Sequence, residues 1–211
     1  MTYEEKYEII KGRTADIMGA MQMAKAARQA GNEEAEFKYA LKAYKDASIL
    51  VKDYPDMEAA FVTYAGSGSS LFRLYDEREL YKEALQLNME ILLKMRLLKN
   101  MLKKERPCVL LIGTMNDSTM CYLELCDKIH LFDKHPLEAL EILALQYDIL
   151  YALQNELKKT SPSNLIFMVV NRVLEVCEDK GATHNPSLSI DDLNGLINKL
   201  ASKLEKIIDL L

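Results

Sequence analysis

The stretch AGSGSS, residues 65–70, lies between FVTY and LFRLYDEREL and decides which fold the chain can adopt. Its small side chains are compatible with a flexible linker, with a phosphate-binding loop, or with a helix that has a narrow face. A linker would divide the chain into two domains and a phosphate loop would indicate a nucleotide enzyme. A helix would indicate a continuous helical scaffold.

The residues around this stretch favour the helix. Apolar or small residues recur at steps of four, three, four and three: Phe61, Ala65, Gly68, Phe72 and Tyr75. This is the spacing of one face of an α-helix, and a linker would interrupt it. A Walker-type loop ends in Gly-Lys-Ser or Gly-Lys-Thr, whereas Leu71 follows Ser70 here. Two glycines in a helix cost about 1 kcal/mol each relative to alanine, so we expect an indented helix surface that another backbone approaches closely.

The same spacing extends over nearly the whole chain and predicts an all-α protein. The expected helices lie at about 2–30, 33–53, 56–75, 77–103, 107–132, 136–159, 162–179 and 190–211. The run LIFMVV at 165–170 is rich in β-branched residues, so a partly stranded conformation of 162–179 stays open. The last helix carries an apolar seam, which we expect to cap the fold by packing on 162–179: Leu193, Ile197, Leu200, Leu204 and Ile207.

Composition and charge narrow the class of protein. The chain has 211 residues, of which 49% are hydrophobic and 28% charged, as in a globular domain, and we expect one domain spanning 1–211. Its net charge of -5 argues against non-specific binding to nucleic acid or anionic membrane. The stretch KMRLLKNMLKKER at 94–106 is basic and amphipathic. Because cations also suit a helix C-terminus, we expect neither nucleic acid nor membrane as a partner.

The N-terminus and the cysteines favour a cytoplasmic location. MTYEEKYEIIKGR lacks the apolar core of a signal peptide, and no apolar stretch is long enough to span a bilayer. The four cysteines form no C-x-x-C pair, so we expect reduced thiols. Asp127-x-x-His130 stands alone and Glu-x-x-His does not occur, so no metal or cofactor is expected. No catalytic motif is present, which favours a non-catalytic protein.

Three segments of similar sequence point to helical hairpins. They are YALKAYKDA (39–47), EALQLNMEI (83–91) and EALEILALQ (138–146), and the turn DERELYK precedes the second. This pattern resembles the tetratricopeptide family over about 31–158, and best at 68–92. Gly68 and Phe72 depart from the family pattern, which favours a large aromatic and a small residue at those two places. The resemblance implies about eight antiparallel helices, stacked as hairpins in a short right-handed superhelix.

In arrays of that family, the first helices of each pair line a concave groove that binds peptides. The resemblance therefore implies that the following residues face such a groove: Gln22, Ser67, Ser69, Ser70, Arg73, Thr114, Asn116 and Asp117. The expected function is that of a non-catalytic adaptor or regulator that binds a protein or peptide segment. Arg73 would pair with an acidic partner or a free C-terminus, or else with Asp76 or Glu77 of its own helix.

Two further points stay open at this level. Residues 116–119, Asn-Asp-Ser-Thr, have low helix propensity. They could form a solvated turn, a polar patch facing AGSGSS, or buried polar packing between helices. The alternative function is a compact bundle with a small-molecule pocket or weak active site around Ser67, Ser70, Asn116 and Asp117. Finally, Gly19, Gly66 and Gly113 are each 47 residues apart and would mark a row of small residues.

Overall fold

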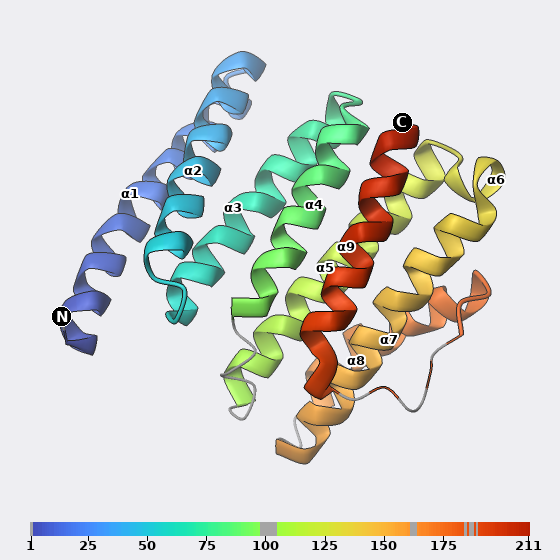
Figure 1. Cartoon of the computed structure of the whole chain (residues 1–211). Coiled ribbons are helices and arrows are strands. Elements are labelled where there is room, and N and C mark those ends of the chain that lie inside the picture. The colour runs from blue at the N-terminus through green and yellow to red at the C-terminus, as the bar shows by residue number, and fades with distance from the viewer. Residues whose placement is uncertain (1, 98–104, 161–163, 184, 186–187, 189) are drawn as a thin grey trace. The chain divides into compact units, whose positions relative to one another are not determined.

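A computed structural model describes residues 2–97, 105–160, 164–183, 185, 188 and 190–211. The elements, shown in Figure 1, are α1 (Tyr3–Gln29), α2 (Glu33–Asp53), α3 (Glu58–Glu77), α4 (Tyr81–Met95), α5 (Glu105–Lys128), α6 (Leu131–Lys134), α7 (Pro136–Thr160), α8 (Asn164–Asp179), the 3₁₀ helix η2 (Ile190–Asp192) and α9 (Leu193–Leu210). No strand occurs among the described residues, which confirms the all-α prediction. Over 164–179, the stretch left open as helix or strand is a helix.

The decisive stretch AGSGSS is helical, as predicted. It lies inside α3, where each of its three serines donates a hydrogen bond to a carbonyl oxygen of its own helix. Ser67 bonds to the carbonyl of Tyr64 at 2.9 Å, Ser69 to that of Ala65 at 3.1 Å and Ser70 to that of Gly66 at 3.2 Å. These bonds satisfy the hydroxyl donors locally, which explains how three serines are accommodated in one helix.

Two helix boundaries differ from the expectation, each at a residue in the left-handed backbone region. Glu79 has φ 58° and separates α3 from α4, so the helix expected from 77 begins at Tyr81 instead. Residues 98–104, where that helix was expected to end and where most of the basic stretch 94–106 lies, are outside the described part of the chain. His130 has φ 55° and ends the helix expected to reach 132, so the short α6 follows α5 separately.

The contacts divide the chain into two compact units, Met1–Leu80 and Tyr81–Leu211. The prediction of one domain over 1–211 stays a prediction. In the first unit, α2 lies between α1 and α3 and packs along both. Its buried face is built largely from alanines, Ala40, Ala43 and Ala47, and small side chains let neighbouring helices approach closely.

In the second unit, α9 packs along α4 and α7, and Figure 1 shows it (red) between these two helices. The predicted apolar seam of α9 is buried. The contacts of the described residues join α9 to α4 and α7, and the expected packing of α9 on 162–179, part of which lies outside the described residues, stays a prediction. Leu196, Ala201 and Ile208 are buried beside the seam. The apolar face is therefore broad enough to cover two neighbouring helices rather than one.

Candidate binding pocket between α1 and α3

The first unit contains two matching stripes of side chains on α1 and α3. The stripe of α1 is Thr14, Met18, Met21, Lys25 and Arg28, and the stripe of α3 is Thr63, Ser67, Ser70, Leu74 and Glu77. Both follow steps of four, three, four and three, so each occupies one helix face. Equivalent members are 49 residues apart, and we refer to the two sets as the α1 stripe and the α3 stripe.

The two stripes touch at both ends. At one end, the hydroxyl oxygens of Thr14 and Thr63 lie 3.2 Å apart. At the other end, the Arg28 guanidinium pairs with Glu77 at 3.1 Å. These two contacts show that α1 and α3 run parallel with a register of 49 residues. The row of small residues expected from Gly19, Gly66 and Gly113 stays a prediction, because Gly113 belongs to the second unit.

Between the two ends the helices enclose a cavity of about 430 Å³. Met18 and Met21 line it from α1, and Ser67 and Ser70 line it from α3. A hydroxymethyl group is too short to fill the space up to a neighbouring helix, and both hydroxyls bond to their own helix. The indented surface expected for AGSGSS is therefore present, and it is an open pocket instead of a close helix contact.

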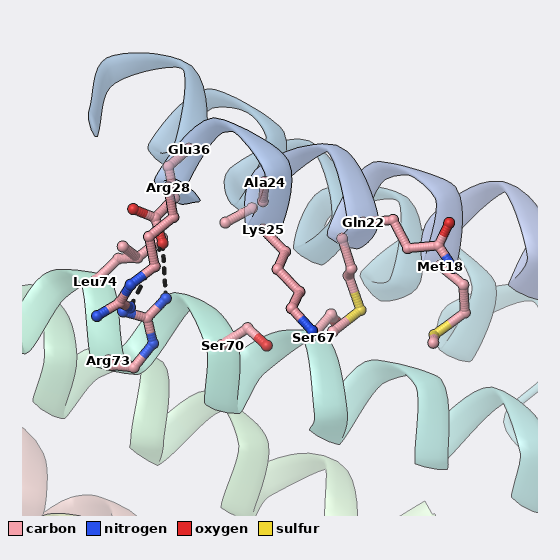
Figure 2. A pocket seen from close by; sticks show the side chains of 12 residues that line it. Met18, Gln22, Ala24, Lys25, Arg28, Glu36, Ser67, Ser70, Arg73 and Leu74 are labelled. Carbon is pink, nitrogen blue, oxygen red and sulfur yellow. Dashed lines mark hydrogen bonds and ion pairs between the residues drawn. The ribbon is translucent and has the colours of Figure 1, made fainter. Parts of the chain in front are cut away.

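The pocket has an apolar floor and a rim that water reaches (Figure 2). Ala24, Ala40 and Leu74 are buried at the floor. Met18, with 46% of its surface exposed, and the exposed Gln22 lie on the rim. A ligand can therefore reach the floor from solvent and exclude water from apolar surface when it binds.

A network of two arginines and two glutamates closes one end of the pocket. Arg73 donates to Glu36 at 2.8 Å and to both carboxylate oxygens of Glu77, at 2.7 and 2.8 Å. Arg28 lies 3.7 Å from Glu36 and 3.1 Å from Glu77. Glu36 comes from α2 and is buried. Burial of an unpaired charge is costly, and the two arginines offset that cost by pairing with Glu36. The hypothesis that Arg73 pairs with Glu77 of its own helix is confirmed, whereas a free Arg73 at a partner carboxylate is not what the structure shows.

Lys25 differs from these arginines, because no ion pair joins it to any described residue. Its side chain extends from α1 toward α3 over the pocket (Figure 2). The residues that line the pocket thus include three cations, Lys25, Arg28 and Arg73, against one carboxylate, Glu36. The pocket is positively charged in a chain whose net charge is negative.

The structure brings four of the eight predicted site residues together. Gln22, Ser67, Ser70 and Arg73 line the pocket, and Ser69 is exposed on α3 outside it. The remaining three, Thr114, Asn116 and Asp117, lie on α5 in the second unit. Thr114 donates to the carbonyl of Leu110 at 3.0 Å, Asn116 is buried and Asp117 is exposed.

Sequence reasoning missed Met18, Met21 and Lys25 on α1. The spacing that could have found them is the 4-3-4-3 pattern from Thr14 to Arg28. Three of its five members are threonine or charged residues, so the stronger apolar pattern toward α2 obscured it. Ile10, Ile17 and Ala24 belong to that other pattern and are buried.

The segment 116–119 is helical, and apart from the exposed Asp117 its residues form buried polar packing. Helix α5 continues through it, and Ser118 and Thr119 are buried. The Ser118 hydroxyl donates to the side-chain oxygen of Asn88 on α4 at 2.5 Å, and the Asn88 amide donates back to the Ser118 carbonyl at 3.1 Å. This reciprocal pair joins α4 to α5 and satisfies polar groups that would otherwise be costly to bury.

The second unit also contains two cysteines, Cys126 and Cys177, whose thiols are buried away from solvent. Burial raises the pKa of Cys126 and of Cys177 to about 12 in each case. Both are therefore protonated at neutral pH, whereas a nucleophilic or metal-binding cysteine acts as the thiolate. Among the described residues, no cluster of three or more His, Cys, Asp or Glu side chains has the arrangement of a metal site.

Comparison of the chain with models of known protein families, with curated proteins and with solved structures gives no match. Within the described residues, no helix combines the length and the apolar character that crossing a membrane requires.

Proposed function

We propose that the chain is a non-catalytic binding module, an adaptor or regulator in the cytoplasm, which holds a short segment of another protein in the pocket between α1 and α3. The observation that carries this proposal is the register of the two stripes. They meet at Thr14–Thr63 and Arg28–Glu77 and leave an apolar-floored cavity between. A cavity that is built into the packing of two helices is preformed, which lowers the entropic cost of binding.

The polar groups of the pocket favour binding over catalysis. Catalysis by a serine needs a base within hydrogen-bond reach of its hydroxyl. The hydroxyls of Ser67 and Ser70 instead donate to main-chain carbonyls of α3. Their remaining lone pairs are acceptors, which suits recognition of a partner's amide or ammonium groups.

A second candidate is a small-molecule site, and the pocket volume favours it specifically. A cavity of about 430 Å³ lies within the range of about 300–1,000 Å³ found for small-molecule sites. The sequence alone suggests a small-molecule site that combines Ser67 and Ser70 with Asn116 and Asp117, but the latter two lie in the second unit. In its present form the site comprises the first-unit residues alone.

The test is a selection of random 12-residue peptides on the full chain, followed by affinity measurements with two matched variants. Ser70→Leu fills the pocket, and Ser69→Leu makes the same change one residue earlier, outside it. We expect Ser70→Leu to weaken binding of the selected peptides at least about tenfold, a loss of about 1.4 kcal/mol, and Ser69→Leu to leave it unchanged. If no peptide is selected, or if both variants bind equally well, the proposed function is wrong.

A further inference from the structure

The charge of Lys25 is available to a ligand. The other two cations of the pocket, Arg28 and Arg73, are held by Glu36 and Glu77. No described residue pairs with Lys25, which lies exposed at the rim. An uncompensated ammonium beside a concave surface attracts a carboxylate from solution.

The same cavity also offers a place for an apolar side chain. Met18 and Met21 line it from α1, and the buried Leu74 lines it from α3. Methionine side chains are flexible and adapt to apolar ligands of different shape. Lys25 and Leu74 line the same cavity, and the Lys25 side chain extends toward Ser67 (Figure 2), so the charge and the apolar lining belong to one site.

We infer that the partner segment inserts one large apolar side chain, Leu, Met or Phe, into this pocket and places an Asp or Glu side chain against Lys25. This inference rests on the proposed function and adds the chemical class of the partner. Glu36 and Glu77 compensate Arg28 and Arg73, so the charge of Lys25 remains, and it is complementary to an acidic segment. It would disfavour a basic one, because like charges brought together reduce affinity.

The experiment uses an array of 15-residue peptides with an alanine-serine background and amidated C-termini. Each peptide carries one apolar residue (Leu, Met, Phe or, as a control, Ala) and, one to four positions away, one of Asp, Glu, Asn, Gln or Lys. Binding is measured with the full chain at low and high salt. We expect Asp and Glu peptides to bind about fivefold more tightly than their Asn and Gln counterparts, as for an exposed ion pair of about 1 kcal/mol. This preference should shrink at high salt.

Two charge reversals identify the residue responsible. Lys25→Glu should invert the preference, so that Lys peptides bind more tightly than Asp peptides. Lys38→Glu is the matched control, because Lys38 is exposed on α2 and does not line the pocket, and it should leave the preference unchanged. Circular dichroism checks that both variants keep the helical content of the parent chain.

The outcomes separate this inference from the proposed function. Peptides that bind through the apolar residue, but equally well with Asp and Asn, would overturn the inference and leave the proposed function standing. The same holds if Lys25→Glu fails to invert the preference. Binding of octanoate, a small apolar carboxylate, together with no binding of any peptide, would overturn both.

Discussion

The hydroxyls of Thr14 and Thr63 meet at 3.2 Å across α1 and α3, and these two residues are 49 positions apart. The same separation joins Arg28 to Glu77 at the other end of the stripes. Between these contacts the register brings serines opposite methionines, and the pocket follows from that pairing. The small side chains of AGSGSS thus form a pocket because they face α1, whose Met18 and Met21 line the same cavity.

Gly66 is a position where alanine should stabilise the protein. It lies exposed inside α3, and a Cβ atom added there would meet no atom within 4 Å. Gly66→Ala should therefore raise the free energy of unfolding by about 1 kcal/mol through helix propensity.

Gly68 is buried, so Gly68→Leu should lower the free energy of unfolding by about 1–3 kcal/mol through overpacking. Chemical denaturation measures both, and a harmless Gly68→Leu would contradict the buried position.

Gly31, in contrast to Gly66, is a position where alanine should destabilise the protein. It follows α1 with φ 69°, a conformation that side chains other than glycine rarely adopt. Gly31→Ala should therefore destabilise the protein even though the added methyl group has free space around it. An equal gain for Gly31→Ala and Gly66→Ala would show that space, and not backbone conformation, decides the effect.

Arg73 is expected to matter for stability, because it holds the buried carboxylate of Glu36 at 2.8 Å. In Arg73→Ala, Glu36 keeps only Arg28 at 3.7 Å, and an under-satisfied buried acceptor costs about 1–3 kcal/mol. The control is Lys42→Ala, which removes the exposed pair of Lys42 with Asp46 and should leave stability nearly unchanged. Equal losses in both variants would contradict a special role for Arg73.

Helix α9 should be required for the second unit to stay folded. Its buried residues cover α4 and α7, so a chain ending at Ser189 would expose the apolar faces of both helices and should aggregate. Removing only Leu210 and Leu211, which are exposed, should leave the protein soluble. Size-exclusion chromatography with light scattering tests both chains. A soluble, monomeric protein that ends at Ser189 and melts at the parent temperature would show that α9 is dispensable.

The two buried thiols predict how stability changes at alkaline pH. In the folded chain Cys126 and Cys177 have pKa values of about 12, against a usual value of 9.0. Between these two values the unfolded chain loses thiol protons that the folded chain retains. The folded state then binds more protons, so the free energy of unfolding falls as pH rises from about 9 to about 12.

The double variant Cys126→Ala, Cys177→Ala isolates this effect from other groups that titrate in the same range. We expect its stability to depend less steeply on pH above 9 than that of the parent chain, whatever its absolute stability. Denaturation at a series of pH values measures the two slopes. Identical slopes would mean that the thiols ionise equally in the folded and unfolded states.

The local structure of this chain could be predicted from its sequence. The 4-3-4-3 spacing from Phe61 to Tyr75 predicted that AGSGSS is helical, and α3 confirms it. Ser67, Ser69 and Ser70 satisfy their hydroxyls within their own helix. Helix formation depends on bonds and side-chain spacing within about four residues, so that the neighbouring sequence carries most of the information.

The pocket and its charges required the tertiary structure. The sequence marked Arg73 as a groove cation, but Glu36 arrives from another helix and holds it, leaving Lys25 as the cation available to a ligand. The sequence likewise showed an apolar seam on α9, but not that α4 and α7 share it. Such pairings join residues tens of positions apart, and many registers bury similar apolar area. Only the packing of all the helices together selects one of them.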